Sequence, residues 1–360
     1  MNQRIVRLCL AVLTLSGSAE GQDVPSVPLP PAEARLEQEF SALVAVRELR
    51  GGRVLLFDLV ESRFMVADLG TGAVRDIARQ GRGPREFENI VGLIALNNDS
   101  TLAVEFGRWH VVLDDSVVAT LPPDTPAIRA ISLFPRGGDL LGRVATRQYA
   151  RRDGEAHHLA LVNRASGRGD TVTRLQVGQR RGRTVVMRDP TGKVTGRGMY
   201  AVPLDVDETF ALFPDGWIAV ARLDPYRVDW RSPDGRWIHG APLPVPAVRL
   251  TEREREAYIA RTRRWRSATD WPEFLPPFEG EAVLAGLDGF ACIKRIPTAD
   301  HPETRYDVID RQGQLRAQLV LPANQHILGF GERTVYVVTT DDDGLQFLSR
   351  HAWPSAQLRG

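Results

Sequence analysis

The sequence predicts an all-β fold, a six-bladed β-propeller with a helical insertion between the fourth and fifth blades. The first observation is a repeat. Six times, an apolar stretch reaches a tight polar or glycine turn and resumes as a second apolar stretch, which is the pattern of a β-hairpin. The second observation is that further apolar stretches follow each hairpin. Four antiparallel strands per unit, repeated along the chain, are typical of propeller blades.

The six turns contain Gly, Pro, Asn and Asp, which reverse a chain at low steric cost. A β-sandwich is the alternative, but a sandwich does not require the same succession of strands and turns six times. We therefore divide residues 40–353 into blades at about 42–90, 91–124, 128–178, 205–246, 277–322 and 323–353. The turns are Arg50–Gly52, Asn97–Ser100, Pro135–Gly138, Pro214–Gly216, Leu287–Gly289 and Gly331–Arg333.

Two insertions interrupt the repeat. Residues 180–207 are basic and rich in glycine. Residues 251–275 begin with Thr251 and nearby glutamates, which resemble a helix-capping signal, so we expect a helix towards Trp265 that forms a lid or brace. The sixth unit lacks a fourth strand of its own. We expect residues 40–46 to supply the strand that closes the ring.

The N-terminus has the layout of a secretory signal peptide. Two arginines precede the apolar run Leu8–Leu15, small residues follow, and cleavage is expected after Ala19 or Gly21. The run is about half of the ~20 residues that a membrane-spanning helix needs. We therefore expect residues 1–21 to be removed, a periplasmic or secreted protein, and a mature chain without a transmembrane segment. Residues 22–39 contain four prolines and are expected to form an extended leader, with residues 354–360 as a tail.

Composition narrows the possible functions. The chain has 46 basic and 45 acidic residues, and this net charge of +1 argues against a nonspecific nucleic-acid-binding protein. Cys292 is the only cysteine outside the signal sequence, which excludes an intramolecular disulfide and a thiolate cage for a metal in the mature chain. We expect a monomer without a cofactor.

A short motif after the first blade connects the sequence to a family. Gln80–Phe87 resembles the G-x-G-P-G-E-F signature of bacterial secreted six-bladed β-propellers, a group related to NHL-repeat and TolB-like proteins. Arg85 stands where the signature has glycine, so the turn is expected to differ slightly if that glycine serves a positive backbone angle. The resemblance covers residues 40–353 and implies the fold. It implies no function, because most members of the group have no assigned activity.

The sequence lacks the common motifs of catalytic and metal sites, among them HExxH, the EF-hand loop, GxSxG and the phosphate-binding loop. We therefore assign no catalytic and no metal-binding residue. His157 and His158 are neighbours on a predicted strand and would point to opposite faces, so we interpret them as structural. Asp341–Gly344 is typical of a solvated turn, with loose calcium binding as the alternative. Cys292 lies in a predicted buried strand, where a thiol is usually inert.

Polar residues near the ends of the second strands form the candidate site. In a propeller these ends line the face on which ligands usually bind. Arginine suits carboxylate or phosphate groups, so basic groups from four blades favour an anionic ligand such as a carboxylated saccharide or an acidic peptide. The alternative is that these groups form ordinary rim salt bridges. The residues are Asp58, Glu105, Arg108, Arg143, Arg222, Lys294, Arg295 and Thr339.

Three functions remain open at this point. The first is an exported, non-catalytic scaffold that binds a protein, peptide or saccharide. The second is a hydrolase or lyase with a divalent metal in the central channel. The third is an assembly partner, for which a large exposed apolar patch would be the sign. Arg261–Arg266, with Trp271 nearby, suggests a nucleic-acid or sugar surface, but three glutamates nearly balance its charge and favour a solvated helix that covers a blade.

Overall fold

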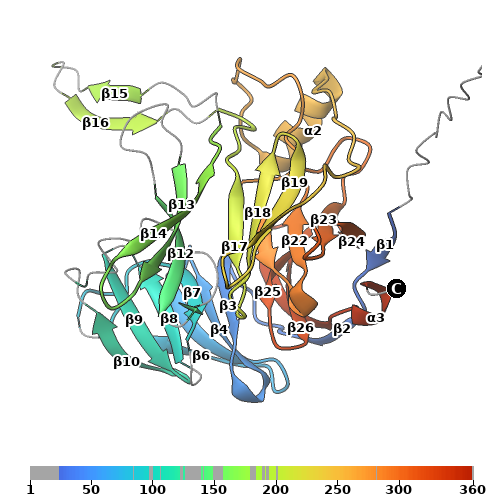
Figure 1. Cartoon of the computed structure of the whole chain (residues 1–360). Coiled ribbons are helices and arrows are strands. Elements are labelled where there is room, and N and C mark those ends of the chain that lie inside the picture. The colour runs from blue at the N-terminus through green and yellow to red at the C-terminus, as the bar shows by residue number, and fades with distance from the viewer. Residues whose placement is uncertain are drawn as a thin grey trace, which may run out of the picture.

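The structure, a computed structural model, confirms the six-bladed β-propeller. It describes residues 24–83, 85–96, 100–105, 107–121, 125, 139–140, 142–148, 157–178, 184–188, 191, 194–199, 202–280 and 282–358. Within these residues, six sheets of four or more strands follow one another along the chain, and Figure 1 shows them arranged around a ring. The predicted signal peptide and the predicted turns at 97–99 and 135–138 lie outside the described residues, as do 180–183 and 192–193 of the basic insertion.

Blades I to IV are each built from four consecutive antiparallel strands. Blade I comprises β3 (Leu43–Glu48), β4 (Arg53–Asp58), β5 (Arg63–Asp68) and β6 (Ala73–Ala78). Blade II comprises β7 (Ile90–Ala95), β8 (Ser100–Glu105), β9 (Arg108–Leu113) and β10 (Ser116–Leu121). Blade III comprises β11 (Asp139–Leu140), β12 (Arg143–Gln148), β13 (His157–Asn163) and β14 (Gly169–Leu175). Blade IV comprises β17 (Thr209–Leu212), β18 (Ile218–Leu223), β19 (Tyr226–Arg231) and β20 (Trp237–His239).

Blades V and VI each take a strand from the N-terminal segment. Blade V comprises β21 (Val283–Ala285), β22 (Ala291–Lys294), β23 (Thr304–Ile309) and β24 (Leu315–Leu321), and β1 (Ser26–Pro28) pairs with β24 in parallel. Blade VI comprises β25 (Gln325–Phe330), β26 (Thr334–Thr340) and β27 (Gln346–Ala352), and β2 (Ala32–Arg35) pairs with β27 as its fourth strand. In Figure 1 these two blue strands lie beside the orange and red sheets.

The closing strand is therefore not the one that we expected. Residues 43–48 form β3, the innermost strand of blade I, so they cannot also be the outer strand of blade VI. Phe40 bridges to Gln346, but the closing strand itself is β2. The segment 22–39, expected as a leader ahead of the fold, thus contains two strands of it. Its prolines are compatible with this position, because an edge strand tolerates residues without an N–H group.

The second strands are buried on both faces, which explains their continuous apolar sequences. In β4, Val54 and Leu56 contact blade VI, whereas Leu55 and Phe57 contact blade II. All four side chains are fully buried. Side chains alternate between the two faces of a strand, and in a propeller each face meets another sheet, so no position in the middle of the strand is left for a polar residue.

Apolar clusters between successive blades join the sheets into a closed ring. Among the described residues, six clusters each combine side chains of two neighbouring blades. The cluster that contains Leu43, Met65 and Tyr336 joins blade VI to blade I. Because every blade packs against two others, the ring buries both faces of each sheet without a disulfide.

The two predicted insertions lie at one end of the ring (Figure 1). The first contains a hairpin of β15 (Thr184–Arg188) and β16 (Val194–Met199). The second contains α2 (Glu252–Thr262), which confirms the helix between blades IV and V, although it ends before Trp265. The chain also has the turns η1 (Arg50–Gly52) and η2 (Leu287–Gly289) and the helix α3 (Ser355–Leu358). None of the helices in the described segments has the length and apolar character that crossing a membrane requires.

Candidate functional site

The ends of the second strands lie on the same face of the ring as α2. In each blade the chain runs down the first strand and up the second, so the second strand ends on the face where one blade connects to the next. We call this the upper face and the opposite one the lower face. Asp58 and Glu105 end β4 and β8, and Lys294 ends β22. Arg108, Arg222, Arg295 and Thr339 also lie near this face, at the start of β9, in β18, after β22 and in β26.

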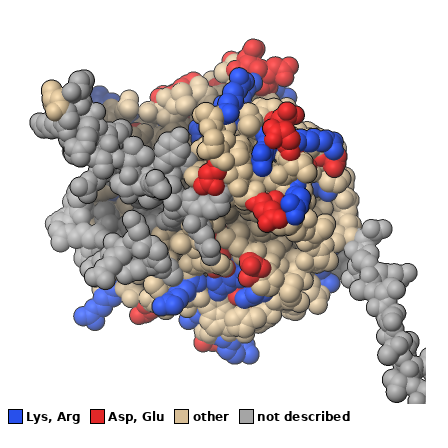
Figure 2. Space-filling view, turned by 90° about the horizontal axis from the view of Figure 1, so that it is seen from above, with Lys and Arg blue, Asp and Glu red and all other residues tan. Residues whose placement is uncertain are grey.

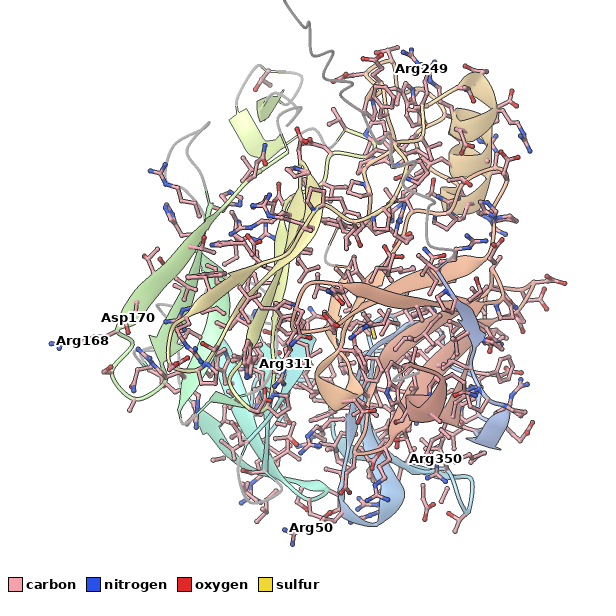
Figure 3. All side chains as sticks on the ribbon, turned by 45° about the vertical axis from the view of Figure 1, so that its right-hand side comes forward. Arg50, Arg168, Asp170, Arg249, Arg311 and Arg350 are labelled. Atoms are coloured by element: carbon pink, nitrogen blue, oxygen red, sulfur yellow. The ribbon has the colours of Figure 1, made fainter. Side chains whose placement is uncertain are left out.

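Arg143 is the exception, and its prediction as part of this face was wrong. It is the first residue of β12, the second strand of blade III, so it lies at the lower end of the blade. Its guanidinium pairs with Asp170, which Figure 3 shows at the left edge of the molecule, far from Arg249 beside α2. The apolar sequence just before Arg143 suggested that a second strand ended there, but Leu140 belongs to the first strand, β11.

Asp58 anchors the chain that enters blade I. Its carboxylate accepts hydrogen bonds from the backbone N–H groups of Ser41 (2.6 Å) and Ala42 (3.2 Å), which precede the first strand. It also accepts from Val60 (3.0 Å) and Glu61 (3.1 Å) in the following turn. The side chain is fully buried and its acceptors are used by the protein itself. Asp58 therefore fixes two connections and does not offer its charge to a ligand.

Glu105 has the same role in blade II. Its carboxylate accepts from the N–H groups of Glu88 and Asn89 (2.8 Å), which precede β7. It also pairs with Arg108 and with His110 Nε2 at 3.0 Å. Burial opposes ionisation of Glu105, but the hydrogen bonds from His110, Arg108 and the backbone lower its pKa to about 2. The carboxylate is thus held ionised in a buried network.

The described residues of Gln80–Phe87 lie in the loop that leads into blade II. Glu86 accepts a hydrogen bond from the N–H of Gly83 at 2.8 Å and pairs with Arg79 at 2.8 Å, which closes the loop. Arg85, which replaces the glycine of the signature, has φ of 66°. The loop therefore keeps the left-handed angle that glycine adopts without strain, and an arginine adopts it here.

The end of this loop is packed into the core. Phe87 is buried and makes edge-to-face contacts with Phe57 (5.6 Å between ring centroids) and Phe64 (5.9 Å). On the upper face, Arg108 Nη2 donates to the carbonyl of Gly81 at 2.7 Å. The motif is therefore a structural connection between blades I and II.

Blades IV and V use basic residues for the same connection. Arg222 pairs with Glu208, the residue before β17, at 2.8 Å and with Asp229 at 2.9 Å. Lys294 Nζ lies 3.0 Å from Glu279, which precedes β21. Figure 2 shows basic and acidic side chains beside one another on the described part of the upper face. Each of these basic groups therefore has an acidic partner within the fold, as expected if they form ordinary salt bridges at the rim.

Arg295 is different, because it lines a pocket of about 600 Å³ on the flank of blade V. One wall is the connection between blades IV and V, from Pro244 to Glu254. A second wall is the β22–β23 connection, which begins with Arg295, and Val24 and Ser26 of the N-terminal segment complete the site with residues of β24. The pocket lies along the outer strands and not in the central channel.

Asp307 holds the guanidinium of Arg295 in place. Arg295 Nη1 lies 3.2 Å from this fully buried carboxylate, which also accepts from Tyr226 Oη (2.8 Å) and Gln318 Nε2 (2.8 Å). Burial, reinforced by Asp307, raises the pKa of Tyr226 well above its ordinary value, so the phenol stays protonated and donates. The guanidinium also lies over the Tyr226 ring, 5.6 Å from its centroid. Arg295 makes a single side-chain hydrogen bond to the described residues, so most N–H donors of its guanidinium remain unused.

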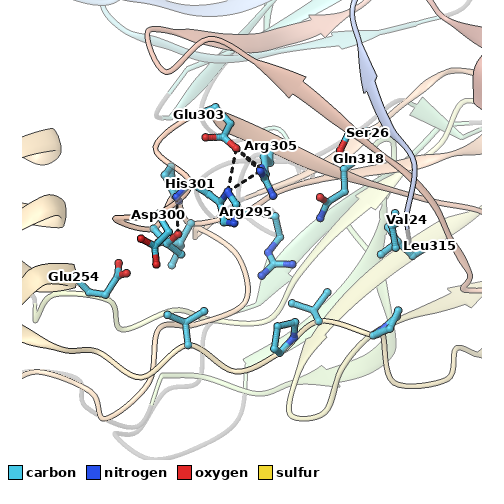
Figure 4. Close-up of a pocket in the computed structure, with 17 residues that line it drawn as sticks. Val24, Ser26, Glu254, Arg295, Asp300, His301, Glu303, Arg305, Leu315 and Gln318 are labelled. Atoms are coloured by element: carbon cyan, nitrogen blue, oxygen red, sulfur yellow. Dashed lines mark hydrogen bonds and ion pairs between the residues drawn. The ribbon is translucent and has the colours of Figure 1, made fainter. Parts of the chain in front are cut away.

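Most other charged groups of the lining are paired. Arg305 donates to Glu303 (2.8 Å) and to His301 Nδ1 (2.8 Å), and Asp300 pairs with Arg253 at 2.6 Å. Figure 4 shows the contacts among Glu303, Arg305 and His301 beside Arg295. Arg295 thus lines the pocket, is held in place by Asp307 and has N–H donors that the protein does not use.

His157, Asp341 and Cys292 make contacts that support the fold. His157 lies 3.8 Å from Asp207, and Asp341 accepts from the N–H of Leu345 at 2.8 Å in the turn before β27. Burial raises the pKa of the Cys292 thiol, which keeps it protonated. Across the described ranges, no three His, Cys, Asp or Glu side chains gather as they would around a metal ion.

Sequence reasoning found Arg295 but missed the rest of the pocket. Gln318 lies on β24, at a position that no motif marks, and the capping signal that contains Glu254 predicted the start of α2 but no pocket. One available signal was the alternating run Pro242–Pro246, because prolines at this spacing stiffen a connection into an extended wall.

Comparison with known proteins adds distant structural likenesses. No protein-family model matches the chain, and no curated protein matches it. Among solved structures, regucalcin, a calcium-binding protein from Agrobacterium tumefaciens, is 12% identical, with 91% of this chain and 96% of that chain covered and a TM-score of 0.44. A candidate exported protein from Bacteroides fragilis is 13% identical, with 92% and 95% covered and a TM-score of 0.44. Virginiamycin B lyase from Staphylococcus aureus is 8% identical, with 89% and 98% covered and a TM-score of 0.42.

Proposed function

We propose that the protein is an exported, non-catalytic binding protein whose pocket on blade V takes a small ligand with an acidic group. The observation that carries this proposal is the position of Arg295. Its guanidinium lines the pocket, is held by Asp307 and uses only one side-chain hydrogen bond among the described residues. The pocket volume of about 600 Å³ falls within the usual range of small-molecule sites, roughly 300–1,000 Å³.

The surroundings of Arg295 favour recognition of a carboxylate or a similar acid. A guanidinium presents several N–H donors in one plane, which matches two oxygens of an acidic group. Asp307 and the Tyr226 ring restrict the side chain before a ligand arrives, so less conformational entropy is lost on binding. Three lining prolines, Pro244, Pro246 and Pro297, supply rigid apolar surface around this group.

The binding test is a thermal-shift screen of the purified mature protein, residues 22–360. The probes are glucuronate, succinate and N-acetylated amino acids, with glucose as the neutral comparison. A ligand that binds only the folded state raises the melting temperature by mass action. We expect acidic probes to raise it in the wild type, and we expect Arg295→Gln to weaken their binding about tenfold or more in calorimetric titration, as for a lost charge-assisted contact.

Arg236→Gln is the matched control, because Arg236 is exposed, pairs with Asp234 and lies in the β19–β20 turn of the lower face. It should bind the probes as the wild type does. Equal affinity in Arg295→Gln and the wild type, or no response to any acidic probe, would contradict the proposed site. Elemental analysis of the same sample tests the enzyme alternative, because a stoichiometric divalent metal with metal-dependent turnover would favour it.

The proposed export of the protein is tested by the position of its mature N-terminus. Mass spectrometry of the protein recovered from the periplasm or the medium should give a mature N-terminus at Glu20 or Gln22, after cleavage behind Ala19 or Gly21. An intact N-terminus and retention in the cytoplasm would show that the apolar run is not a cleaved signal.

A further inference from the structure

We infer that the ligand of the blade V pocket is dipolar, with an ammonium group in addition to the acidic group, as in a free amino acid or a short peptide. This inference rests on the proposed function, because it assigns the acidic end of the ligand to Arg295. Its second pole is Glu254, which lines the same pocket from α2.

Glu254 is a buried carboxylate that forms no close ion pair with a described residue. Its residue is only 7% exposed, and it is the one buried residue of α2. Its carboxylate accepts one hydrogen bond, from the N–H of Ala299 at 2.9 Å, and forms no ion pair with a described residue. Arg261, on the same helix, attracts Glu254 only over a longer distance and donates to the carbonyl of Pro297 at 3.3 Å.

A buried carboxylate without a close countercharge is costly, because it loses hydration and the more distant Arg261 offsets only part of that loss. A ligand ammonium would supply that countercharge and hydrogen-bond donors at the same time. The other carboxylates of the lining do not need one, since Glu303 pairs with Arg305 and Asp300 with Arg253. Glu254 and Arg295 are thus the two described lining groups whose charge or donors are not fully used by the protein.

The space between the two poles suits a short organic chain. Figure 4 shows Glu254 at one side of the lining, Arg295 in the middle, and Gln318 and Ser26 at the other side. Val245, Pro246 and Ile296 add apolar surface to the same lining. A dipolar molecule could therefore place its acid at Arg295 and its ammonium at Glu254, with apolar groups against these side chains.

The test uses pairs of probes that differ only in the ammonium. Alanylleucine and a panel of free amino acids and dipeptides are compared with their N-acetylated forms by calorimetric titration. In the wild type, acetylation should weaken binding about tenfold or more, as for the loss of a buried charge pair. In Glu254→Gln, which keeps an acceptor for Ala299, the free and acetylated forms should bind equally. Glu256→Gln, an exposed change on the same helix, is the matched control and should behave as the wild type.

The outcomes separate this inference from the proposed function. Equal binding of free and acetylated probes by the wild type would overturn the ammonium site and leave recognition of the acid by Arg295 intact. Failure of all acidic probes, dipolar or not, would overturn both. A preference for the free form that persists in Glu254→Gln would place the ammonium elsewhere and overturn the role of Glu254.

Discussion

Arg85 has a backbone conformation that glycine adopts more easily. Its φ of 66° lies in the left-handed region, where a Cβ atom crowds the following carbonyl. The loop around it is fixed by Glu86 and by the buried Phe87, so the chain cannot relax by changing this angle alone. The strain is therefore retained in the folded state.

Arg85→Gly should stabilise the protein by about 0.5–1 kcal/mol, because the relief of left-handed strain exceeds the greater flexibility that glycine adds to the unfolded chain. Urea unfolding monitored by tryptophan fluorescence measures the change. Arg82→Gly is the control in the same loop, since Arg82 does not have a positive φ, and it should be neutral or destabilising. A lower unfolding midpoint for Arg85→Gly would contradict the prediction, because it would show that the positive φ of Arg85 does not strain the folded protein.

Among the strands, polar contacts tie the end of a second strand to the segment before the first strand of the same blade. A carboxylate does this in blades I and II, through Asp58 and Glu105. In blade VI, Asn324 Nδ2 donates to the carbonyl of Thr340 at 2.9 Å. These contacts recur because the first strand of each blade must be held at the inner edge of its sheet.

The Glu105 contact gives a pH dependence that can be measured. Its pKa in the folded protein, about 2, lies below the ordinary 4.5, so its contribution to stability is complete above pH 4.5 and is lost as the pH falls towards 2. This lowering corresponds to about 3 kcal/mol. The stability difference between the wild type and Glu105→Gln, from urea unfolding at pH 7, 5 and 3, should shrink at pH 3.

Asp342→Asn is the control for this series, since Asp342 is exposed in the turn between β26 and β27. Its difference from the wild type should stay small at each pH. Parallel pH profiles of the wild type and Glu105→Gln would mean that the buried carboxylate does not contribute to acid sensitivity.

At the scale of the whole molecule, stability depends on a closed ring whose last sheet is completed by the N-terminal segment. The closing contact continues beyond β2: the N–H of Leu36 donates to the carbonyl of Leu348 at 2.9 Å, and its side chain is fully buried between blades VI and I. Loss of this contact weakens the junction between the two ends of the ring, and blades VI and I each depend on that junction for one of their two neighbours.

Leu36→Ala should therefore destabilise the molecule by about 2–5 kcal/mol, the cost of a cavity in a packed core. Leu59→Ala, at an exposed leucine on blade I, should change the free energy of unfolding by less than about 0.5 kcal/mol. Denaturant unfolding compares the two variants. Similar small effects would show that the N-terminal segment is an appendage and not part of the ring.

The sequence by itself determined the fold class and the number of blades. Apolar runs such as that of β4, separated by turns with Gly, Asp and Pro, are local features, and their repetition leaves few ways to bury both faces of each sheet. The helix of the second insertion was also predictable, because its cap at Thr251 is local. Local hydrogen bonding and periodicity are properties of consecutive residues, so a sequence displays them directly.

Only the tertiary structure decided which strand closes the ring, which end of blade III carries Arg143, and where a pocket lies. β2 pairs with residues more than 300 positions away, and the pocket combines Val24, Glu254, Arg295 and Gln318 from distant segments. By apolar pattern, residues 40–46 were the better candidate for the closing strand, but the polar segment Ala32–Arg35 is the one that pairs with the edge of blade VI. Such contacts arise from packing between distant segments, and no periodicity in the chain records them.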